Sequence, residues 1–334
     1  MKARLLSAVI ATMIAITSSS ASFAEVSEIR IAQQFGLGYL PLMVMQDKRL
    51  IEQEAAVLGM PAPKVNWLRV GVASAMMDGL LSGSIDFISG GVPTLILLWS
   101  RTKDNIGVKG VGAMNSQPIV LTTRNPDVKT IRDFTEKDRI AVVTVKSSAS
   151  AIVLQMAAAK TFGQDQYGKL DHLTVTRSNP DGMIALLSHS EITAHFGPAP
   201  FYYYELEKPG IHQVLSSDDI FGGPATSTVV MTSSKFRTAN PKTYDAFARA
   251  FADAIEIINK DKPAAAELYL RVSGDKTPVK DILRMLEDPS IGYGIGPKAL
   301  LQFAQFMHRV GTVPVRAESW KDMFFPNAHG YEGN

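Results

Sequence analysis

Apolar and polar positions follow two periodic patterns, one typical of strands and one of helices, along most of the chain. Short runs with apolar residues at every or every second position are typical of strands, and longer runs with apolar residues three and four apart are typical of helices. The two kinds of run alternate, which predicts an α/β architecture. Strands are expected over residues 28–32, 65–70, 85–88, 106–113, 118–123 and 139–145, and near 173 and 192. Helices are expected over residues 41–58, 73–81, 93–100, 146–162 and 181–187, with a short helical turn at 131–134.

The pattern becomes mostly helical after residue 232. Asn240 and Pro241 suit the cap and first residue of a long helix, whose apolar residues then fall on one face. Pro263, Pro278 and Pro297 each suit a first helical position. We therefore expect four helices in this part of the chain, covering one lobe of the protein, and we interpret the apolar face as core packing.

Two extended segments with similar alternation, PIVLTTR and STVVMTSSKF, lie roughly a hundred residues apart. If both cross between lobes, they form a two-stranded hinge that supports closure around a ligand. This predicts a first lobe made of residues 25–121 and 230–334 and a second lobe made of residues 122–229. The short segments LLSGS and LLSHS are similar, and this similarity is consistent with two lobes of similar architecture.

The first residues have the order of a secretory signal. Lys2 and Arg4 precede an apolar run from residue 5 to residue 16, and small residues follow up to Ala24. The apolar run is shorter than a membrane span requires. We expect export to the periplasm with cleavage near Ala24, and a retained N-terminal anchor is the alternative.

Composition narrows the range of functions. The 334 residues are 46% hydrophobic and 20% charged, which is typical of a globular protein. Loss of Lys2 and Arg4 from 34 basic residues would leave 32 against 32 acidic ones, and this balance argues against a nucleic-acid partner. The chain has no cysteine, which excludes thiolate metal sites and cysteine nucleophiles. We expect no metal and no cofactor.

Three junctions share the order strand, small-residue loop, helix start: residues 34–41, 88–94 and 145–150. In open α/β sheets, ligands bind beyond the carboxyl ends of strands. Glycine allows close approach, and helix starts offer free N–H groups with a partial positive charge, so the junctions together predict an anion site. The candidate ligand-binding residues at these junctions are Gln34, Gly36, Tyr39, Gly90, Gly91, Thr94, Ser147, Ser148 and Ser150.

The stretch KSSASA at the third junction carries more hydroxyls than a helix cap needs. One serine suffices to cap the helix, and the others could donate to an oxyanion, with Lys146 at the rim. The alternative is a cap on a polar surface turn.

Three further residues are weaker candidates. Arg69 near a strand end could pair with an anion or lie on the surface, and Ser74 could be a ligand donor or an ordinary first-turn residue. His195 ends a strand on the cleft side of the second lobe, or is a core histidine. The run Tyr202-Tyr203-Tyr204 is interpreted as packing, because consecutive helical residues cannot share one pocket.

Enzyme motifs are not found. The chain has no HExxH, no GxSxG and no Walker motif, and the SxxK match at residues 100–103 lacks companion motifs. We therefore expect a binding protein and not an enzyme.

Several segments in order resemble the periplasmic solute-binding proteins of ABC importers in the nitrate/taurine/sulfonate family. The similar segments are IRIAQQFGLGYLPLMVMQDKRLIEQEA, MMDGLLSGSIDFISGGVPTLI, TIRDFTEKDRIAVVTVKSSASAIVLQMAAAKTFG and ALLSHSEITAHFGPAPFYYYEL. The resemblance implies a two-lobed type II periplasmic-binding fold and a small organic anion, either sulfonate-, taurine- or nitrate-like or an aromatic acid. Delivery to a permease with a separate ATPase is implied as well, and we expect a monomer.

The resemblance also implies that residues 34–39, 89–94 and 147–150 hold the anionic head. One segment departs from the family: many relatives carry a tryptophan–acid–proline segment where this chain has HFGP at residues 195–198. This leaves the identity of the anion open. The alternatives to transport are a sensory solute-binding adaptor and an enzyme on the same fold, of the thiamine-precursor or menaquinone-pathway type.

Overall fold

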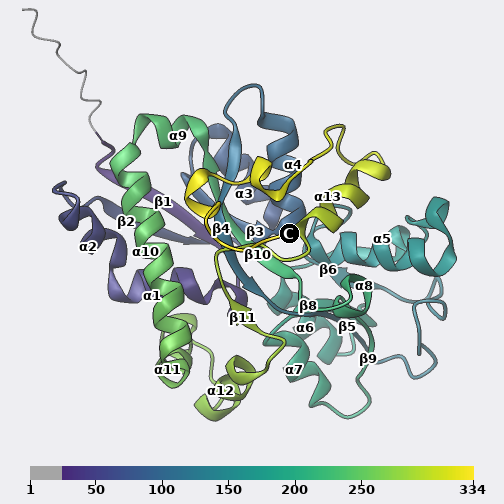
Figure 1. The fold of residues 1–334 in the computed structure, drawn as a ribbon. Coiled ribbons are helices and arrows are strands. Elements are labelled where there is room, and N and C mark those ends of the chain that lie inside the picture. Colours follow the sequence, from purple (N-terminus) through teal and green to yellow (C-terminus); the bar gives the residue numbers. More distant parts are fainter. Residues whose placement is uncertain (1–24) are drawn as a thin grey trace, which may run out of the picture.

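The computed structural model describes residues 25–334, so the expected signal peptide at residues 1–24 lies outside the described residues. The described chain forms two sheets with helices around them (Figure 1). The first sheet has the order β11-β4-β10-β3-β1-β2. Its strands are β1 (Glu28–Gln33), β2 (Lys64–Arg69), β3 (Phe87–Gly91), β4 (Val108–Ser116), β10 (Thr226–Ser233) and β11 (Gly292–Tyr293).

The second sheet repeats part of this plan. Its order is β7-β6-β8-β5-β9. In each sheet three parallel strands are followed by an antiparallel one, which is β10 in the first sheet and β5 in the second. The strands are β5 (Ile119–Thr123), β6 (Ile140–Val142), β7 (Thr174–Thr176), β8 (Ala194–Pro198) and β9 (His212–Ser216). The expected α/β class and two units of like build are therefore observed.

Helices of the described chain surround both sheets. The α-helices are α1 (Leu40–Lys48), α2 (Leu50–Val57), α3 (Ala73–Ser82), α4 (Val92–Thr102), α5 (Ala149–Phe162), α6 (Asn179–Leu187), α7 (Phe201–Leu206), α8 (Asp218–Phe221), α9 (Ser234–Ala239), α10 (Pro241–Lys260), α11 (Lys262–Ser273), α12 (Val279–Glu287) and α13 (Leu300–Arg309). Short 3₁₀ turns are η1 (Leu37–Tyr39), η2 (Gln164–Gln166), η3 (Asp171–Leu173), η4 (Trp320–Met323) and η5 (Pro326–Ala328). None of the described helices is long and apolar enough to cross a membrane.

The long helix α10 supplies a large part of the core beside the first sheet, where it packs along α1 and α2 (Figure 1). Its apolar face is buried as expected, and the rings of Phe247 and Phe87 of β3 stack with centroids 3.9 Å apart. Stacked and edge-on aromatic pairs add to the free energy gained from area burial alone. The sequence interpretation of this face as core is confirmed.

Several element boundaries differ from the expectation. The helix expected over residues 41–58 is broken at Arg49, whose φ of 54° is left-handed, so α1 and α2 are separate. Residues 131–134 form a turn held by Asp133, which accepts from the backbone N–H groups of Lys129 and Thr130. The strand expected over residues 139–145 is only Ile140–Val142.

The two segments expected to form a hinge each belong wholly to one sheet. Residues 119–123 form β5 of the second sheet, and residues 226–233 form β10 of the first. The predicted lobe boundaries therefore fall inside strands. The chain crosses between the sheets just before β5, at Gln117, and again just before β10, near residues 222–225. Alternation identifies a strand but does not say which sheet it joins.

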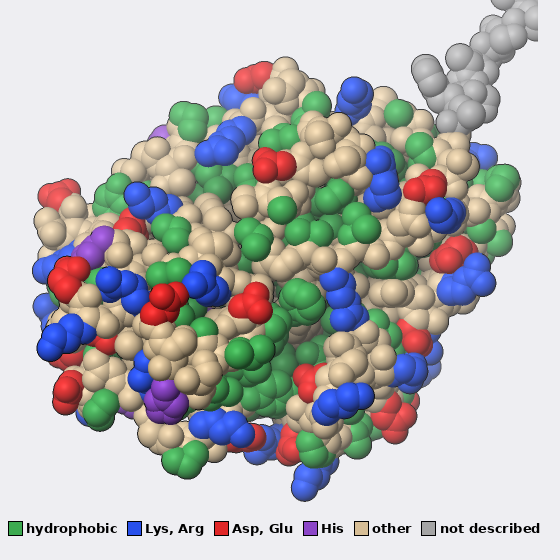
Figure 2. All heavy atoms as spheres, turned by 180° about the vertical axis from the view of Figure 1, so that it is seen from behind, with side chains coloured by type: hydrophobic (Ala, Val, Ile, Leu, Met, Phe, Trp, Pro, Cys, Tyr) green, Lys and Arg blue, Asp and Glu red, His purple; other side chains and the backbone are tan. Residues whose placement is uncertain are grey.

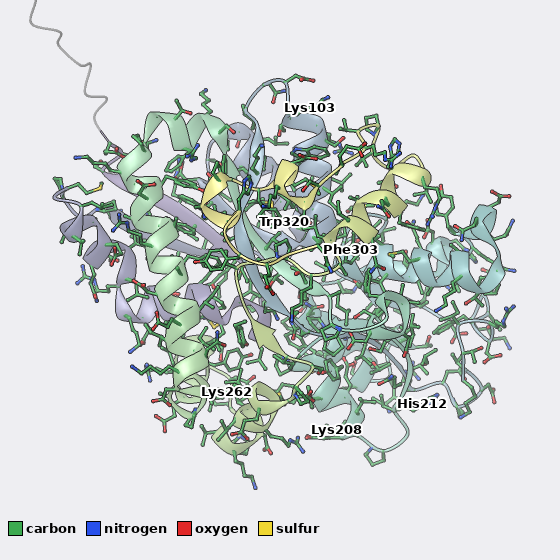
Figure 3. All side chains as sticks on the ribbon, viewed as in Figure 1. Lys103, Lys208, His212, Lys262, Phe303 and Trp320 are labelled. Atoms are coloured by element: carbon green, nitrogen blue, oxygen red, sulfur yellow. The ribbon has the colours of Figure 1, made fainter. Side chains whose placement is uncertain are left out.

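The two units touch at several points besides these crossings. Phe303 of α13, labelled in Figure 3, packs against Phe221 of α8 with ring centroids 4.7 Å apart. The hydroxyls of Tyr203 and Tyr204 on α7 donate to Asp288 and Asp275, at 2.5 and 2.9 Å. The tyrosine run therefore joins the two units through hydrogen bonds, in addition to the packing role expected for it.

On the face of the molecule seen in Figure 2, basic and acidic side chains are interspersed. No large field of one sign dominates that view. This agrees with the near balance of charge in the sequence.

Candidate functional site

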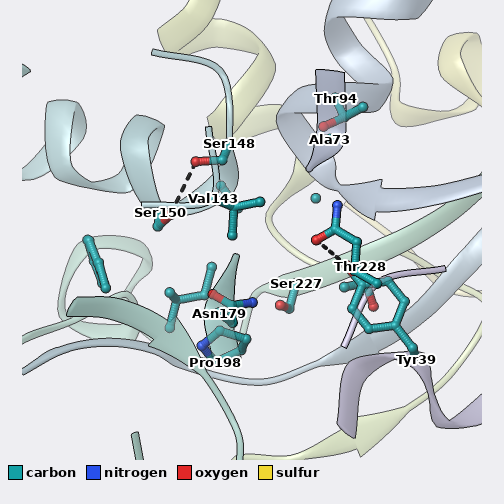
Figure 4. Close-up of a pocket in the computed structure, with 15 residues that line it drawn as sticks. Tyr39, Ala73, Thr94, Val143, Ser148, Ser150, Asn179, Pro198, Ser227 and Thr228 are labelled. Atoms are coloured by element: carbon teal, nitrogen blue, oxygen red, sulfur yellow. Dashed lines mark hydrogen bonds between the residues drawn. The ribbon is translucent and has the colours of Figure 1, made fainter. Parts of the chain in front are cut away.

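A cavity lies between the two sheets, with about 450 Å³ of empty space including its mouth. The part of this space that the centre of a water-sized sphere can reach is about 40 Å³, so the cavity is narrow in this structure. Figure 4 shows the fifteen residues that line it. From the first-sheet unit come Gln34, Tyr39, Ala73, Gly91, Thr94, Ser227 and Thr228, and from the second-sheet unit come Ile119, Val143, Ser148, Ala149, Ser150, Asn179, Phe196 and Pro198.

Four helices begin at this cavity. Ala73 is the first residue of α3, Gly91 caps α4, Ser148 caps α5, and Asn179 is the first residue of α6. Each helix start leaves N–H groups without helical acceptors and carries roughly half a positive charge. The backbone alone therefore makes the cavity attractive to an anion.

The side chains that line the cavity are all uncharged. The polar ones carry hydroxyl or amide groups, which are Gln34, Tyr39, Thr94, Ser148, Ser150, Asn179, Ser227 and Thr228. Such groups can donate hydrogen bonds to an anion but bind it less strongly than a buried lysine or arginine would. The arrangement suits an anion that must be released again.

Two of the three serines at the start of α5 face the cavity. Ser148 accepts a hydrogen bond from the N–H of Ala151 at 3.4 Å, so it caps the helix. Its Oγ lies 3.2 Å from the Oγ of Ser150, and both side chains are buried (Figure 4). Ser147 is directed elsewhere, since its hydroxyl donates to the carbonyl of Val145 at 3.4 Å. The extra hydroxyl at Ser150 therefore accepts no capping bond and lines the cavity.

Gln34 and Tyr39 form a second pair of polar groups. The hydroxyl of Tyr39 donates to Oε1 of Gln34 at 3.2 Å. Burial raises the pKa of Tyr39 far above its usual range, so the phenol stays protonated and keeps donating. Because the oxygen of the Gln34 amide is engaged in this way, its NH₂ group is left to donate into the cavity.

Asn179 is a third polar group, on the opposite wall. It is 6% exposed, and its Oδ1 has no hydrogen-bond partner among the described residues. Buried side-chain amides in folded proteins are nearly always satisfied. The unpaired atom is an acceptor, so it suits a hydrogen-bond donor on a solute, whereas contact with an anion would use the NH₂ group of the same amide.

The second-sheet unit also supplies an apolar wall. Phe196 and Pro198 of β8 lie beside Ile119 and Val143 along the cavity. Phe196 is fully buried. A solute held here would present its polar head to the helix starts and any hydrocarbon part to this wall.

Half of the predicted ligand residues line the cavity, namely Gln34, Tyr39, Gly91, Thr94, Ser148 and Ser150. The structure places the other predicted residues elsewhere. Arg69 donates to the carbonyls of Val272 and Ser273, at the C-terminal end of α11, where a cation is favoured. Ser74 is exposed, and Gly90 pairs with Val229 inside the first sheet.

His195 lies behind the cavity wall and not on it. Its Nδ1 is 2.5 Å from Oε1 of Glu205, and the other oxygen of Glu205 accepts from Thr122 at 2.6 Å. His195 and Glu205 are 1% and 0% exposed. Successive strand residues point to opposite faces, so the strand that turns Phe196 to the cavity turns His195 away from it. The remaining predicted residue, Gly36, lies against the backbone of Ala199.

The lining residues that the sequence analysis missed left weak signals. Ser178-Asn179-Pro180 has the order of a cap followed by a proline-containing first turn, but the helix was expected to start at Asp181. Ser227 and Thr228 lie in the segment interpreted as hinge. Phe196 differs from His195 only in which face of the strand it takes, and a short apolar strand does not reveal that.

Among residues 25–334, no three His, Asp or Glu side chains are grouped so that they could hold a metal ion. At the cavity the described chain offers hydroxyl, amide and backbone groups.

The comparisons with known proteins agree with this architecture. The NMT1-like family matches residues 23–272. No curated protein is similar enough in sequence to match the chain. Three of the similar solved structures are periplasmic binding proteins, and all three are too distant in sequence to show more than the fold.

The alkanesulfonate-binding protein SsuA from Xanthomonas axonopodis pv. citri, bound to MOPS, has a TM-score of 0.69 at 17% identity, over 90% of this chain and 98% of that chain. The nitrate-binding protein NrtA from Synechocystis PCC 6803 has a TM-score of 0.71 at 15% identity, over 91% and 87%. The aliphatic sulphonate-binding protein SsuA from Escherichia coli has a TM-score of 0.63 at 18% identity, over 91% and 99%. The chain has the two-lobed fold of these periplasmic solute-binding proteins and belongs to the NMT1-like family.

Proposed function

We propose that this protein is the periplasmic solute-binding component of an ABC importer. It captures a small organic anion in the cavity between the two sheets and delivers it to a permease that works with a separate ATPase. The observation that carries the proposal is the meeting of four helix starts at one uncharged cavity. Relatives of the same fold that bind sulfonates and nitrate support it.

The chemistry of the cavity favours a particular kind of anion. Hydroxyl and amide donors surround the helix starts, and the wall made by Ile119, Val143, Phe196 and Pro198 is apolar. A singly charged head with a short hydrocarbon or aromatic part satisfies both.

The two units act as lobes in this proposal. We assign lobes by sheet membership, so β5 goes to the second lobe and β10 to the first. Solute contacts groups from both lobes, and therefore it stabilises the closed arrangement relative to the open one. The closed form would then present to the permease a surface that the open form lacks.

The proposed role includes no chemistry on the solute. Among residues 25–334, the buried histidine–carboxylate pair near the site is His195 with Glu205, and the strand that carries Phe196 separates it from the cavity. Hydroxyl and amide donors without an adjacent base suit reversible binding. Export with loss of residues near Ala24, and action as a monomer, remain part of the proposal.

A thermal-shift panel tests this function on protein freed of bound solute by mild unfolding and refolding. Ethanesulfonate and ethanesulfonamide form a matched pair of similar size that differs in charge, and MOPS, taurine, nitrate and benzoate extend the range. A solute present at a hundredfold excess over its Kd stabilises the folded state by about 2.7 kcal/mol. We expect a shift from at least one anion and none from the sulfonamide. A shift from the uncharged ethanesulfonamide alone contradicts the proposal.

A further inference from the structure

Three glycines of the first-sheet unit lie where this unit approaches the second. A methyl group added at Gly36 would lie 3.0 Å from the carbonyl oxygen of Ala199. At Gly71 it would lie 3.0 Å from Cβ of Ser178, and at Gly91 it would lie 2.9 Å from Cβ of Ala149. Real Cβ atoms almost never come within 3.0 Å of other heavy atoms, as one at Gly91 would, and the 3.0 Å contacts at Gly36 and Gly71 are tight enough that the neighbouring atoms would have to shift by a few tenths of an ångström. We call these three glycines and their contacts the closure seam.

The backbone does not explain why Gly71 and Gly91 are glycines. The φ of Gly91 is −67°, and Gly71 is not in the left-handed region, so an alanine could adopt either conformation. Neither position has room for the methyl group of an alanine. The nearest atoms are Cβ of Ser178 and Cβ of Ala149, which belong to the other unit. Gly36 differs, because its φ of 113° favours glycine as well.

The seam brings helix starts together in pairs across the cavity. Gly71 precedes α3 and meets Ser178, the cap of α6. Gly91 caps α4 and meets Ala149, the first residue of α5. At the third contact, next to Gly36, the N–H of Leu37 donates to the carbonyl of Ala199 at 3.1 Å.

This pairing has an electrostatic consequence. Each helix start carries a partial positive charge, so closing the seam brings like-signed ends together. An anion between them replaces this repulsion with attraction. The seam therefore couples closure to the charge of the solute, provided that the helix starts can approach closely.

We propose that the closure seam of Gly36, Gly71 and Gly91 determines how far the two lobes close and so how tightly the site holds its solute. Gly71 is the informative position, because it does not line the cavity. This inference rests on the proposed function for its effect on binding. The contact itself can be tested with no solute present, because the closed form is also populated without solute, at a lower level, and a disulfide traps it.

Engineered disulfides test the contact. The chain has no native cysteine, so any disulfide joins the introduced pair. The seam pairs are Gly71→Cys with Ser178→Cys, and Gly91→Cys with Ala149→Cys. The control pairs exchange partners, joining position 71 with 149 and position 91 with 178. A disulfide needs Cβ atoms about 3.8 Å apart, and the seam pairs, at 3.0 and 2.9 Å in this structure, reach that separation when the seam opens by about 1 Å. We therefore expect fast oxidation of the seam pairs and at least about tenfold slower oxidation of the exchanged pairs.

Substitution by alanine tests the consequence. Gly71→Ala should leave the unfolding temperature of the solute-free protein unchanged and weaken binding of ethanesulfonate, or of the panel anion with the largest shift, about tenfold. Gly294→Ala is the matched control, because a methyl group there meets no atom within 4 Å. Small-angle scattering of Gly71→Ala with solute should show the larger radius of gyration of an open form.

The outcomes separate the two proposals. Fast oxidation of the seam pairs without binding of any panel anion supports the seam and contradicts the proposed function. If the wild-type protein binds an anion but the seam pairs oxidise no faster than the exchanged pairs, the proposed function is supported and the seam is contradicted. Unchanged affinity and scattering of Gly71→Ala, relative to Gly294→Ala, overturns the inference as well.

Discussion

Ser148 and Ser150 offer a way to separate helix capping from solute binding within one stretch of sequence. Ser148 does both, since it caps α5 and lines the cavity, whereas Ser150 lines the cavity without accepting a capping bond. Ser147, with its hydroxyl on the carbonyl of Val145, does neither. Replacing each serine by alanine gives three variants of almost equal volume with different expected behaviour.

The magnitudes follow from the geometry. The capping bond of Ser148 is long at 3.4 Å, so its loss should cost about 0.5–1 kcal/mol, near the low end for such caps. In a chain of this size that lowers the unfolding temperature by roughly 1–3 °C. A hydrogen bond to a charged group contributes about 1.5–3 kcal/mol, so Ser148→Ala and Ser150→Ala should each weaken anion binding roughly 10- to 100-fold.

The assay measures unfolding of the solute-free protein by scanning calorimetry and anion affinity by titration calorimetry. We expect reduced stability and affinity for Ser148→Ala, reduced affinity alone for Ser150→Ala, and wild-type values for Ser147→Ala. Full affinity in Ser150→Ala would refute the assignment of its hydroxyl to the solute. Reduced affinity in Ser147→Ala would refute the orientation of the three serines.

Further predictions concern acid stability, the contact between the units and the apolar wall. Burial works to raise the pKa of Asp138, but hydrogen bonds from Thr135 and neighbouring groups outweigh it and hold that pKa below its usual range. An acid with a lower pKa folded than unfolded stabilises the fold above about pH 4 and loses this effect as the pH falls through the folded value. Asp138→Asn should therefore lower the free energy of unfolding at pH 7 and make it fall less steeply as the pH is lowered. Urea unfolding from pH 7 to pH 3 measures both effects. The same decline in acid as in the wild-type protein would contradict this. Burial also works to raise the pKa of Asp288, and hydrogen bonds that include the one from Tyr203 reverse the direction. Tyr203→Phe should raise that pKa in an NMR titration and cost about 1–2 kcal/mol of stability, and an unmoved titration would show that the bond is absent in solution. Phe196→Ala should widen the cavity and shift preference from ethanesulfonate toward the bulkier MOPS, measured by titration calorimetry, and equal losses for both solutes would argue against Phe196 as part of the wall.

Much of the fold could be predicted because the evidence for it is local. The helix starts at Pro41, Pro93 and Pro241 follow from the fixed φ of proline, and the apolar spacing along α10 identifies its buried face. The break at Arg49 could not be predicted, because a left-handed arginine carries no glycine or proline signal. The sheet to which β5 or β10 belongs is decided by strands far away in the sequence. Alternation along each segment does not reveal this, and so both segments were interpreted as hinge strands.

The site divides in the same way. Helix-start residues such as Gly91, Thr94 and Ser148 could be found, because strand, loop and helix occur in sequence order. Asn179 and Phe196 could not, since one depends on a helix boundary two residues earlier than expected and the other on which face of a strand meets the cavity. Arg69 has the right charge to bind an anion, but its guanidinium donates to a carbonyl at the end of α11 instead. The sequence does not show that α11 lies beside it.

The most direct test of the account is a crystal structure of the protein with the panel anion that gives the largest thermal shift. The account predicts the charged head between the starts of α3, α4, α5 and α6, within hydrogen-bond distance of Ser150 and Asn179, with the rest of the solute against Phe196. An anion bound outside this cavity, or a head group turned away from the helix starts, would contradict the central claim that an uncharged cavity holds an anion by its helix starts.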